Sequence, residues 1–347
     1  MSTLPHIHQD PSARSVRADN DPSTRVLEVA NLRVVFEDET RTVTAVDGVS
    51  FSVHKGRTLA IVGESGSGKS VTSLAVMRLL PEHSARISGS VHFDGRQLLD
   101  ETKSGMRSLR GNRMAMIFQE PMTSLNPSYT VGEQINEVIL RHRDISKKEA
   151  TQRGIDMLKL VRIPSPEARY SQFPHNLSGG MRQRVMIAMA LACDPELLIA
   201  DEPTTALDVT IQAQVLELMR DLQQKTGTAI VLITHDLGVV AESCDDVIVM
   251  YAGQVVEQCS VEDLFSFPQH PYTVGLLGSL PRLDEKRDQL VAITGTVPDM
   301  ANLPTGCRFR ARCPFSVAKC AEMPELMEVS AGHLSRCWRT PLQDLVP

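Results

Sequence analysis

The chain has 347 residues, of which 42% are hydrophobic and 22% charged, and its formal net charge is −6. That composition is typical of a globular protein and excludes a disordered or collagen-like chain. The acidic balance argues against nucleic acid as a partner, because binding to a phosphate backbone needs a cationic surface. No apolar run approaches the roughly 18 residues that a membrane-spanning helix needs. No apolar secretory signal opens the chain, so we expect a cytosolic protein.

Residues 1–25 are polar and predict a flexible leader. From residue 26 onward, short β-branched runs alternate with helical stretches, which predicts an α/β core with a largely parallel sheet. Several of these runs are almost wholly apolar, as in strands that are covered on both faces. The expected strands are 26–36, 58–62, 114–118, 197–200, 229–234 and 247–250.

Two further segments differ from this core. Between about residues 120 and 186 the strand signal fades and apolar residues fall on helical faces, which predicts a helical insert. After about residue 260, prolines punctuate a stretch with few periodic segments. We therefore expect a core of residues 26–260 that contains the insert, followed by a C-terminal extension of residues 261–347.

A glycine-rich loop follows the expected strand 58–62 and precedes a helical pattern. It fits G-x-x-x-x-G-K-[ST] at every fixed position, and in this setting it predicts a site for a nucleotide triphosphate. Glycines let backbone N–H groups converge on phosphate, and the helix N-terminus favours an anion. Lys69 can neutralise the β- and γ-phosphates, and the Ser70 hydroxyl can bind Mg²⁺. The predicted nucleotide-binding residues of the loop are Gly63, Glu64, Ser65, Gly66, Ser67, Gly68, Lys69 and Ser70.

Two carboxylates end the apolar run 197–200. Successive strand residues point in opposite directions, so Asp201 and Glu202 cannot share one task. We assign Asp201 to Mg²⁺, through water, and Glu202 to polarising the water that attacks the γ-phosphate. His235 follows an expected strand parallel to the two that deliver Ser70 and Glu202, so these three residues should emerge at the same sheet edge. Gln119 lies just beyond the expected strand 114–118. Gln119 would sense Mg²⁺ or the water, and His235 would contact the γ-phosphate.

Residues 176–184, Asn-Leu-Ser-Gly-Gly-Met-Arg-Gln-Arg, offer a second helix N-terminus to an anion. The hydroxyl of Ser178 and the N–H groups of Gly179 and Gly180 can bind phosphate. Since the chain already has one phosphate loop, the simplest account is that this turn serves the nucleotide bound to another subunit. The segment resembles the LSGGQ signature of ABC-type ATPases, with Met181 where glutamine is usual.

The resemblance to ABC-type ATPases extends from residue 26 to the end of the chain. Further matches are Gln119 for the Q-loop, Asp201 and Glu202 for the end of the Walker B motif, Asp208 for the D-loop and His235 for the switch histidine. Phe36 is the candidate that stacks on adenine, although an aromatic residue at a strand end more often belongs to the core. The resemblance implies ATP and Mg²⁺ as ligands. It also implies that two ATPase subunits close head to tail on two ATP molecules and that hydrolysis reopens them.

Within this superfamily, residues 119–127, 173–175 and 268–273 are similar to those of the oligopeptide/dipeptide importer ATPases. Related importers of nickel and glutathione share much of this pattern, so the cargo stays open. The resemblance implies a peripheral subunit on the cytoplasmic face of the cell's inner membrane. Its implied partners are a second, related ATPase subunit, two integral membrane permease subunits and an extracytoplasmic solute-binding protein.

Two other functions are open to an ABC-type ATPase. A soluble enzyme that acts on nucleic acid usually carries two ATPase cassettes or a long coiled coil. This chain has a single phosphate loop, no sustained heptads and a net negative charge. An export ATPase is the other alternative, but the chain has no fused membrane span and its extension resembles that of importers.

Four of the seven cysteines lie close together in the extension, namely Cys307, Cys313, Cys320 and Cys337. A cytosolic chain keeps its thiols reduced, so this group indicates a metal site rather than disulfides. The spacing alone leaves Zn²⁺ and an iron–sulfur cluster open, and four unliganded thiols are a third alternative. The peptide-importer resemblance favours a 4Fe–4S cluster in a structural role. His333, between the last two cysteines, is expected at the surface or beside the ligands rather than among them.

Overall fold

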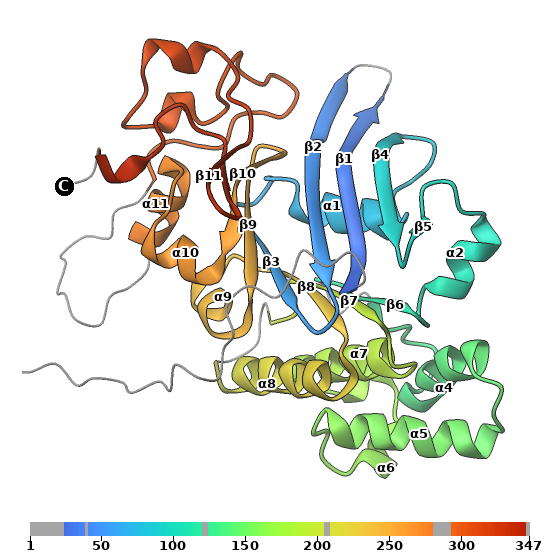
Figure 1. The fold of residues 1–347 in the computed structure, drawn as a ribbon. Helices are drawn as coiled ribbons and strands as arrows, with labels where there is room; N and C mark the ends of the chain where they lie inside the picture. Colours follow the sequence, from blue (N-terminus) through green and yellow to red (C-terminus); the bar gives the residue numbers. More distant parts are fainter. Residues whose placement is uncertain (1–23, 39–40, 120–123, 205–208, 280–292, 345–347) are drawn as a thin grey trace, which may run out of the picture.

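The computed structural model describes residues 24–38, 41–119, 124–204, 209–279 and 293–344. Most of the predicted leader, 1–25, and the predicted D-loop residue Asp208 lie outside the described residues. Two sheets form the centre of the molecule, and helices pack between them and on the outer face of the larger one (Figure 1).

The larger sheet has eight strands in the order β11-β12-β10-β9-β3-β8-β7-β6. The five strands from β9 to β6 run parallel, and β10, β12 and β11 extend the sheet in antiparallel fashion. This confirms the predicted α/β class with a largely parallel sheet. The strand bounds are β3 Thr58–Val62, β6 Met114–Ile117, β7 Leu197–Asp201, β8 Ala229–Ile233, β9 Asp246–Tyr251, β10 Gln254–Ser260, β11 Met327–Ser330 and β12 His333–Ser335.

A second, antiparallel sheet has the order β2-β1-β4-β5. Of its strands, the sequence predicted only β1, Arg25–Glu37. The prediction missed β2 (Thr42–His54), β4 (Ala85–Phe93) and β5 (Arg96–Gln97). In β2 the buried side chains step from Val46 to Val49 at a register shift against β1, which interrupts the period-two pattern that Val49, Phe51 and Val53 otherwise follow.

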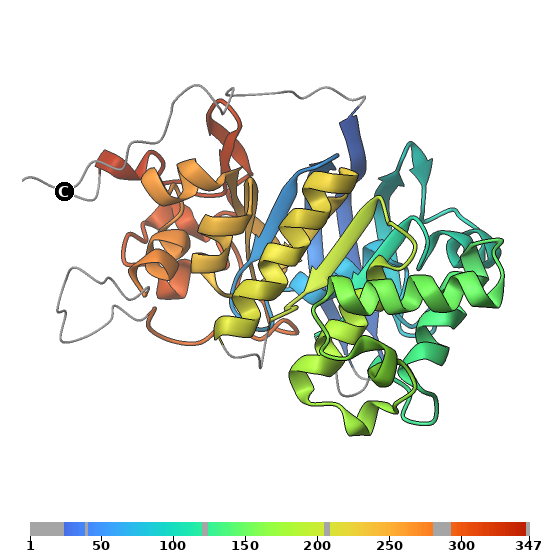
Figure 2. The same ribbon diagram turned by 90° about the horizontal axis from the view of Figure 1, so that it is seen from below.

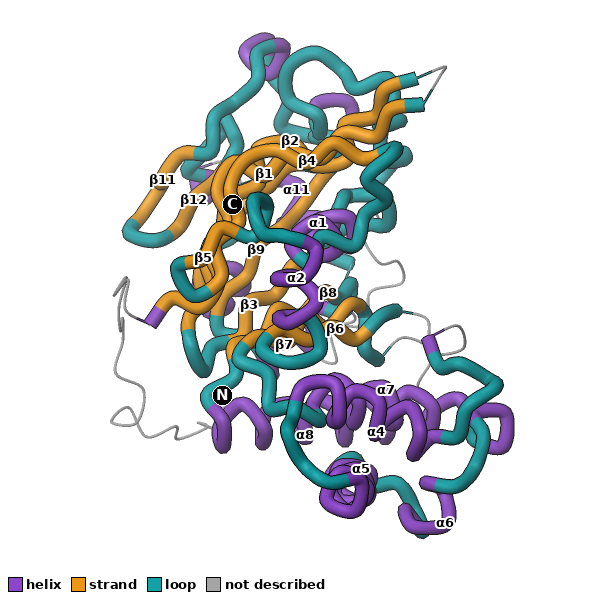
Figure 3. Tube along the Cα trace, turned by 90° about the vertical axis from the view of Figure 1, so that its right-hand side faces the viewer, coloured by secondary structure: helices purple, strands orange, loops and turns teal. Residues whose placement is uncertain are grey.

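Helices cover both faces of the parallel strands, and the strand residues alternate accordingly. In β7, Leu197 and Ile199 join the cluster beneath the second sheet, together with helices α1 (Lys69–Val76) and α2 (Lys103–Leu109). Leu198 and Ala200 face the opposite cluster. The helices of that side are α4 Val131–His142, α5 Lys147–Leu160, α7 Gly179–Leu191 and α8 Val209–Thr226, with the short turns α6 Pro166–Tyr170 and η2 Pro174–Asn176 beside them. Helices α4 to α7 lie together below the strands in Figure 3, and α8 packs directly against the sheet.

The C-terminal region packs on the β9–β10 side of the large sheet, and the green helical lobe lies at the opposite end (Figure 2). A third core cluster joins the region to β3, β9 and β10. The elements here are α9 Leu237–Ser243, α10 Val261–Ser266, α11 Pro271–Gly278, and the turns η3 Arg310–Arg312, η4 Ala318–Ala321 and η5 Leu342–Asp344. Within the described ranges, no helix has the length and apolar character needed to span a membrane.

Candidate nucleotide site and C-terminal region

The phosphate loop lies at the carboxyl end of β3 and leads directly into α1. Lys69 begins this helix and folds back over the loop. Its Nζ donates hydrogen bonds to the carbonyl oxygens of Gly63 at 2.7 Å and Glu64 at 3.0 Å. Burial lowers the pKa of Lys69, while the nearby carboxylates Glu202 and Asp201 act in the opposite direction. Neutral carbonyls are weaker partners for an ammonium group than phosphate oxygens, so a bound triphosphate can replace them.

Two glycines of the loop are required by close backbone contacts. A Cβ on Gly63 would lie 2.2 Å from the carbonyl oxygen of Met250, and one on Gly68 would lie 2.6 Å from that of Ala45. Both glycines have a positive φ, of 149° and 99°. A side chain at either position would clash with backbone that belongs to a neighbouring strand, so β2 and β9 enclose the loop.

Ser70 and Asp201 form the second part of the site. The Oγ of Ser70 donates to Oδ1 of Asp201 at 3.1 Å. Asp201 ends β7 and is 4% exposed, and burial raises the pKa of its carboxyl against the lowering effect of the hydrogen bond from Ser70. A hydroxyl and a carboxylate side by side are hard oxygen ligands of the kind that Mg²⁺ prefers.

Glu202 turns away from Asp201 because its backbone adopts a left-handed conformation, with φ 46°. Its Oε2 accepts a hydrogen bond from Nε2 of Gln119 at 3.2 Å, and its Oε1 lies 3.5 Å from Nδ1 of His235. Gln119 follows β6, and His235 follows β8, the two strands that flank β7. The structure thus brings together Gln119, Asp201, Glu202 and His235 at one edge of the sheet.

The signature turn opens α7. Ser178 is the N-cap of this helix, and its Oγ accepts a hydrogen bond from the Met181 backbone at 3.3 Å. Ser178 and Gly179 are exposed, and a Cβ on Gly179 would meet nothing within 4 Å. The turn therefore presents a helix N-terminus at the surface, with room for an incoming group. Phe36 lies on β1 opposite Val43 and packs half-buried against the first core cluster.

Two family models match this chain. One, described as ABC transporter, matches residues 46–205, and the other, described as oligopeptide/dipeptide transporter, C-terminal region, matches residues 256–320. The probable peptide ABC transporter ATP-binding protein y4tR of Sinorhizobium fredii is 54% identical over 92% of this chain and 97% of that protein. The oligopeptide transport ATP-binding protein AppD of Bacillus subtilis is 55% identical over 90% of this chain and 96% of that protein.

This chain belongs to the oligopeptide/dipeptide family of ABC transporter ATP-binding subunits. Its fold agrees with that assignment. The dimeric post-hydrolysis structure of the ATP-binding cassette MJ0796, bound to ADP and Pi, superimposes with a TM-score of 0.61 at 26% identity. The match covers 68% of this subunit and 98% of the cassette, so the subunit has a further part beyond the cassette.

Two residues of the subunit's C-terminal region reach the phosphate loop, and the sequence analysis assigned no role to either. The hydroxyl of Tyr272, on α11, accepts a hydrogen bond from the Glu64 backbone at 2.8 Å. The guanidinium group of Arg312, on η3, donates to both carboxylate oxygens of Glu64, at 2.8 Å and 3.1 Å. An ion pair between residues 248 positions apart leaves no local pattern, so no sequence signal could have revealed it.

The four cysteines of the subunit's C-terminal region lie near one another. The pKa of Cys337 is raised to about 12. Burial is the main cause, and the thiols of Cys307, Cys313 and Cys320 each contribute to the rise. No three of the four sulfur atoms, all of them within the described part of the chain, lie within 4.8 Å of one another. A single zinc ion with Zn–S bonds of about 2.3 Å would hold its sulfurs within about 4 Å. A four-iron cluster takes one thiolate per iron and therefore holds its ligands further apart.

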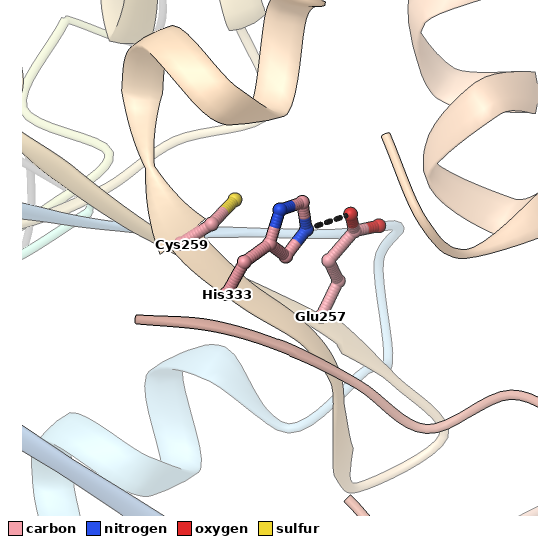
Figure 4. A group of neighbouring side chains, drawn as sticks. All are labelled: Glu257, Cys259 and His333. Atoms are coloured by element: carbon pink, nitrogen blue, oxygen red, sulfur yellow. Dashed lines mark hydrogen bonds and ion pairs between the residues drawn. The ribbon is translucent and has the colours of Figure 1, made fainter. Parts of the chain in front are cut away.

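A different group of side chains is compact, and Figure 4 shows it. Glu257, Cys259 and His333 are all buried, with ligand atoms within 4.8 Å of one another. Oε1 of Glu257 lies 2.7 Å from Nε2 of His333, and the two carboxylate oxygens also accept the backbone N–H groups of Gln269 and His270. The expectation that His333 lies at the surface is therefore wrong, because its side chain is 2% exposed.

This buried group joins three segments of the subunit rather than forming an open site. Glu257 lies on β10 and His333 on β12, while the two backbone donors precede α11. Burial raises the pKa of Cys259, so its thiol stays protonated. The carboxylate already has three partners, which satisfies it where an unpaired charge would be costly. The group therefore stabilises the contact between the extension and the large sheet.

Proposed function

We propose that this subunit binds and hydrolyses ATP to energise the import of oligopeptides or dipeptides across the cytoplasmic membrane. The observation that carries the proposal is the convergence of the phosphate loop with Gln119, Asp201, Glu202 and His235 at one sheet edge. Family membership supports the transport role, and the similar proteins named above are described as acting in peptide transport.

Each residue of the edge has a separate task in this mechanism. Lys69 would neutralise the β- and γ-phosphates. Ser70 would bind Mg²⁺ directly, and Asp201 would bind it through a water molecule. Glu202 would accept the proton of the attacking water, with Gln119 and His235 on either side of the carboxylate to orient the water and the γ-phosphate. The remaining residues of the loop, 63–68, would surround the phosphates with backbone N–H groups, and Phe36 would stack on the adenine.

The signature turn would complete the site of a second subunit. Ser178, Gly179 and Gly180 begin α7 at the surface, and a helix N-terminus with free N–H groups suits a γ-phosphate. ATP would then join two subunits head to tail, and hydrolysis would remove the contact that holds them closed. We propose a related ATPase chain as the second subunit, and a D-loop role for Asp208.

The proposed assembly places this subunit on the cytoplasmic face of the inner membrane. Two integral permease subunits would take up the motion of the ATPase pair, and an extracytoplasmic solute-binding protein would deliver the peptide. In this organisation, residues 26–260 form the ATPase domain, the insert 120–186 its helical subdomain, and 261–347 the extension.

The deciding experiment is reconstitution of the subunit with its cognate permease, second ATPase and binding protein in proteoliposomes. We expect ATP-dependent uptake of a labelled peptide and ATP hydrolysis that the loaded binding protein stimulates. A Lys69→Ala variant should lose both. Uptake of nickel or glutathione in place of peptides would redirect the proposal, and failure of the subunit to bind permease chains would overturn it.

We further propose that Cys307, Cys313, Cys320 and Cys337 hold a 4Fe–4S cluster. The mutual influence of the four thiols supports a shared metal site, and the resemblance to peptide-importer ATPases favours the cluster over zinc. When bound, the cluster would cross-link the segments of the extension that carry the four cysteines. Anaerobic purification should yield brown protein with iron and sulfide in equal amounts, whereas colourless protein with zinc would contradict the proposal.

A further inference from the structure

The backbone N–H and the carboxylate of Glu64 are both held by residues of the C-terminal extension. Its backbone N–H donates to the hydroxyl of Tyr272, and its carboxylate accepts two hydrogen bonds from the guanidinium group of Arg312. Its carbonyl accepts a hydrogen bond from Nζ of Lys69. The same residue thus connects the extension to the cation of the phosphate loop. Because Lys69 binds the carbonyls of both Gly63 and Glu64, a shift in this part of the loop changes the position of its ammonium group.

Arg312 is fixed in one orientation by its other partners. Its Nε donates to the carbonyl of Thr294 at 2.9 Å, and its side chain is only 7% exposed. The guanidinium lies 5.7 Å from the ring centroid of Tyr251 and 5.9 Å from that of Phe309. A planar cation that is stacked on aromatic rings and hydrogen-bonded on several sides loses little entropy when it pairs with a carboxylate.

The charge of Glu64 matters because of where it lies. Its side chain is 27% exposed and belongs to a loop whose task is to bind several negative charges. Its carboxylate acts on Lys69 electrostatically, as those of Glu202 and Asp201 do. Without Arg312, the Glu64 carboxylate would repel the triphosphate and attract Lys69 away from it.

We propose that Arg312 and Tyr272 are positioning residues of the nucleotide site, and that Arg312 neutralises Glu64 so that the loop can accept a triphosphate. The extension is then part of the ATP site. This inference deepens the proposed function and rests on it. The task of Arg312 is therefore electrostatic, to neutralise the Glu64 carboxylate, and not only to hold the loop in place.

Calorimetric titration of the full-length subunit with Mg-ATP tests the proposal. Arg312→Gln leaves Glu64 uncompensated, and we expect about tenfold weaker ATP affinity, equivalent to about 1.4 kcal/mol. Glu64→Gln removes the repulsion and leaves the Arg312 cation without its carboxylate, so this variant should bind ATP more tightly than the wild type. The double variant should bind near the wild-type level, because no carboxylate then remains to be neutralised.

Two further variants separate charge from structure. Arg310→Gln removes an exposed cation from the same η3 turn and should leave ATP affinity unchanged. Tyr272→Phe keeps the buried ring but removes the acceptor for the Glu64 backbone, and should weaken binding about threefold, equivalent to about 0.7 kcal/mol. Thermal unfolding of each variant shows whether the chain is folded.

The outcomes distinguish the inference from the proposed function. If the wild-type subunit does not bind Mg-ATP, the proposed function fails. If it binds but Arg312→Gln binds equally well, only the inference is overturned. A loss in Arg312→Gln that persists unchanged in the double variant would also overturn it, because the role of Arg312 would then be structural.

Discussion

At the scale of the residue, Glu202 and Asp201 have different surroundings, as the roles proposed for them require. Asp201 continues β7 and meets Ser70, whereas the left-handed backbone of Glu202 turns its side chain toward Gln119 and His235. The two carboxylates therefore have different partners although they are neighbours in sequence. That separation is the physical basis for giving them different tasks.

We expect Glu202→Gln to reduce the rate of ATP hydrolysis about 100-fold or more while Mg-ATP binding is retained. The amide keeps the shape and the hydrogen-bonding ability of the side chain but cannot accept a proton from water. A general base typically increases a reaction rate by a factor of about 10²–10⁴. Single-turnover hydrolysis and calorimetric binding measure the two quantities. The variant should also accumulate as a closed pair with the second ATPase subunit.

Glu196→Gln is a matched control for this variant. Glu196 precedes the other end of β7, where its exposed carboxylate pairs with Arg113. This control should hydrolyse ATP at the wild-type rate. Wild-type hydrolysis by Glu202→Gln would refute the role that we give to Glu202.

At the scale of the element, the phosphate loop depends on close contact with two neighbouring strands. Gly63→Ala should destabilise the subunit by about 1–3 kcal/mol relative to Gly66→Ala, because forcing extra atoms into packed backbone costs about that much. Both glycines have a positive φ, but only the Cβ at Gly63 would meet backbone, 2.2 Å from the oxygen of Met250. Urea unfolding without nucleotide measures the difference, and equal stability of the two variants would contradict this account.

The N-cap of the helix α11 is a buried histidine, His270. Its Nδ1 accepts the backbone N–H of Tyr272 at 3.1 Å. Complete burial lowers the pKa of His270 from 6.5 to about 3. The folded state therefore binds fewer protons than the unfolded state between these values, and the stability that His270 contributes is lost as the pH falls from about 6.5 toward 3.

Urea unfolding at several pH values from 7.5 to 5 checks the cap. The contribution of one such group falls by at most about 1.4 kcal/mol per pH unit. His270→Asn keeps a capping side chain that cannot be protonated, so its stability should depend less on pH than that of the wild type. The same substitution at the exposed His83 should leave the pH dependence unchanged, and an equal effect at both positions would contradict the prediction.

The elements differ in how far the sequence reveals them. The parallel strands and the carboxyl-end residues were predictable because an apolar run and the polar residue after it are adjacent in the chain, as in β7 and Asp201. The strand β2 was not, since a register shift against β1 between Val46 and Val49 interrupts its alternation. The contacts of Arg312 and Glu257 could not be predicted either, because each depends on how distant segments pack.

At the scale of the whole molecule, the four cysteines and the ATP site are connected through η3. Arg312 precedes Cys313 directly, so the ligands of the proposed cluster and the partner of Glu64 share one turn. We expect removal of the metal with a chelator to weaken Mg-ATP affinity, because η3 would lose its anchor and Arg312 its fixed position. Calorimetry of loaded and stripped subunit measures the change.

Glu64→Gln supplies the control for that experiment. In this variant the carboxylate that Arg312 neutralises is absent, so stripping the metal should alter ATP affinity much less than in the wild type. An equal loss in both proteins would show that the metal acts on nucleotide binding by another route. No loss in the wild type would show that the two sites are independent.

The continuity of the large sheet into the extension has a consequence for protein engineering. β10 pairs with β9 on one side and with β12 on the other, and the buried Glu257 takes all its partners from residues beyond 268. A shortened protein that ends at residue 260 would expose the edge of β10. It would also leave the Glu257 carboxylate without partners in apolar surroundings. We therefore expect a protein trimmed to a minimal cassette to be insoluble. A loss of ATP hydrolysis after such a deletion should be attributed to unfolding of the sheet that the ATPase domain and the extension share.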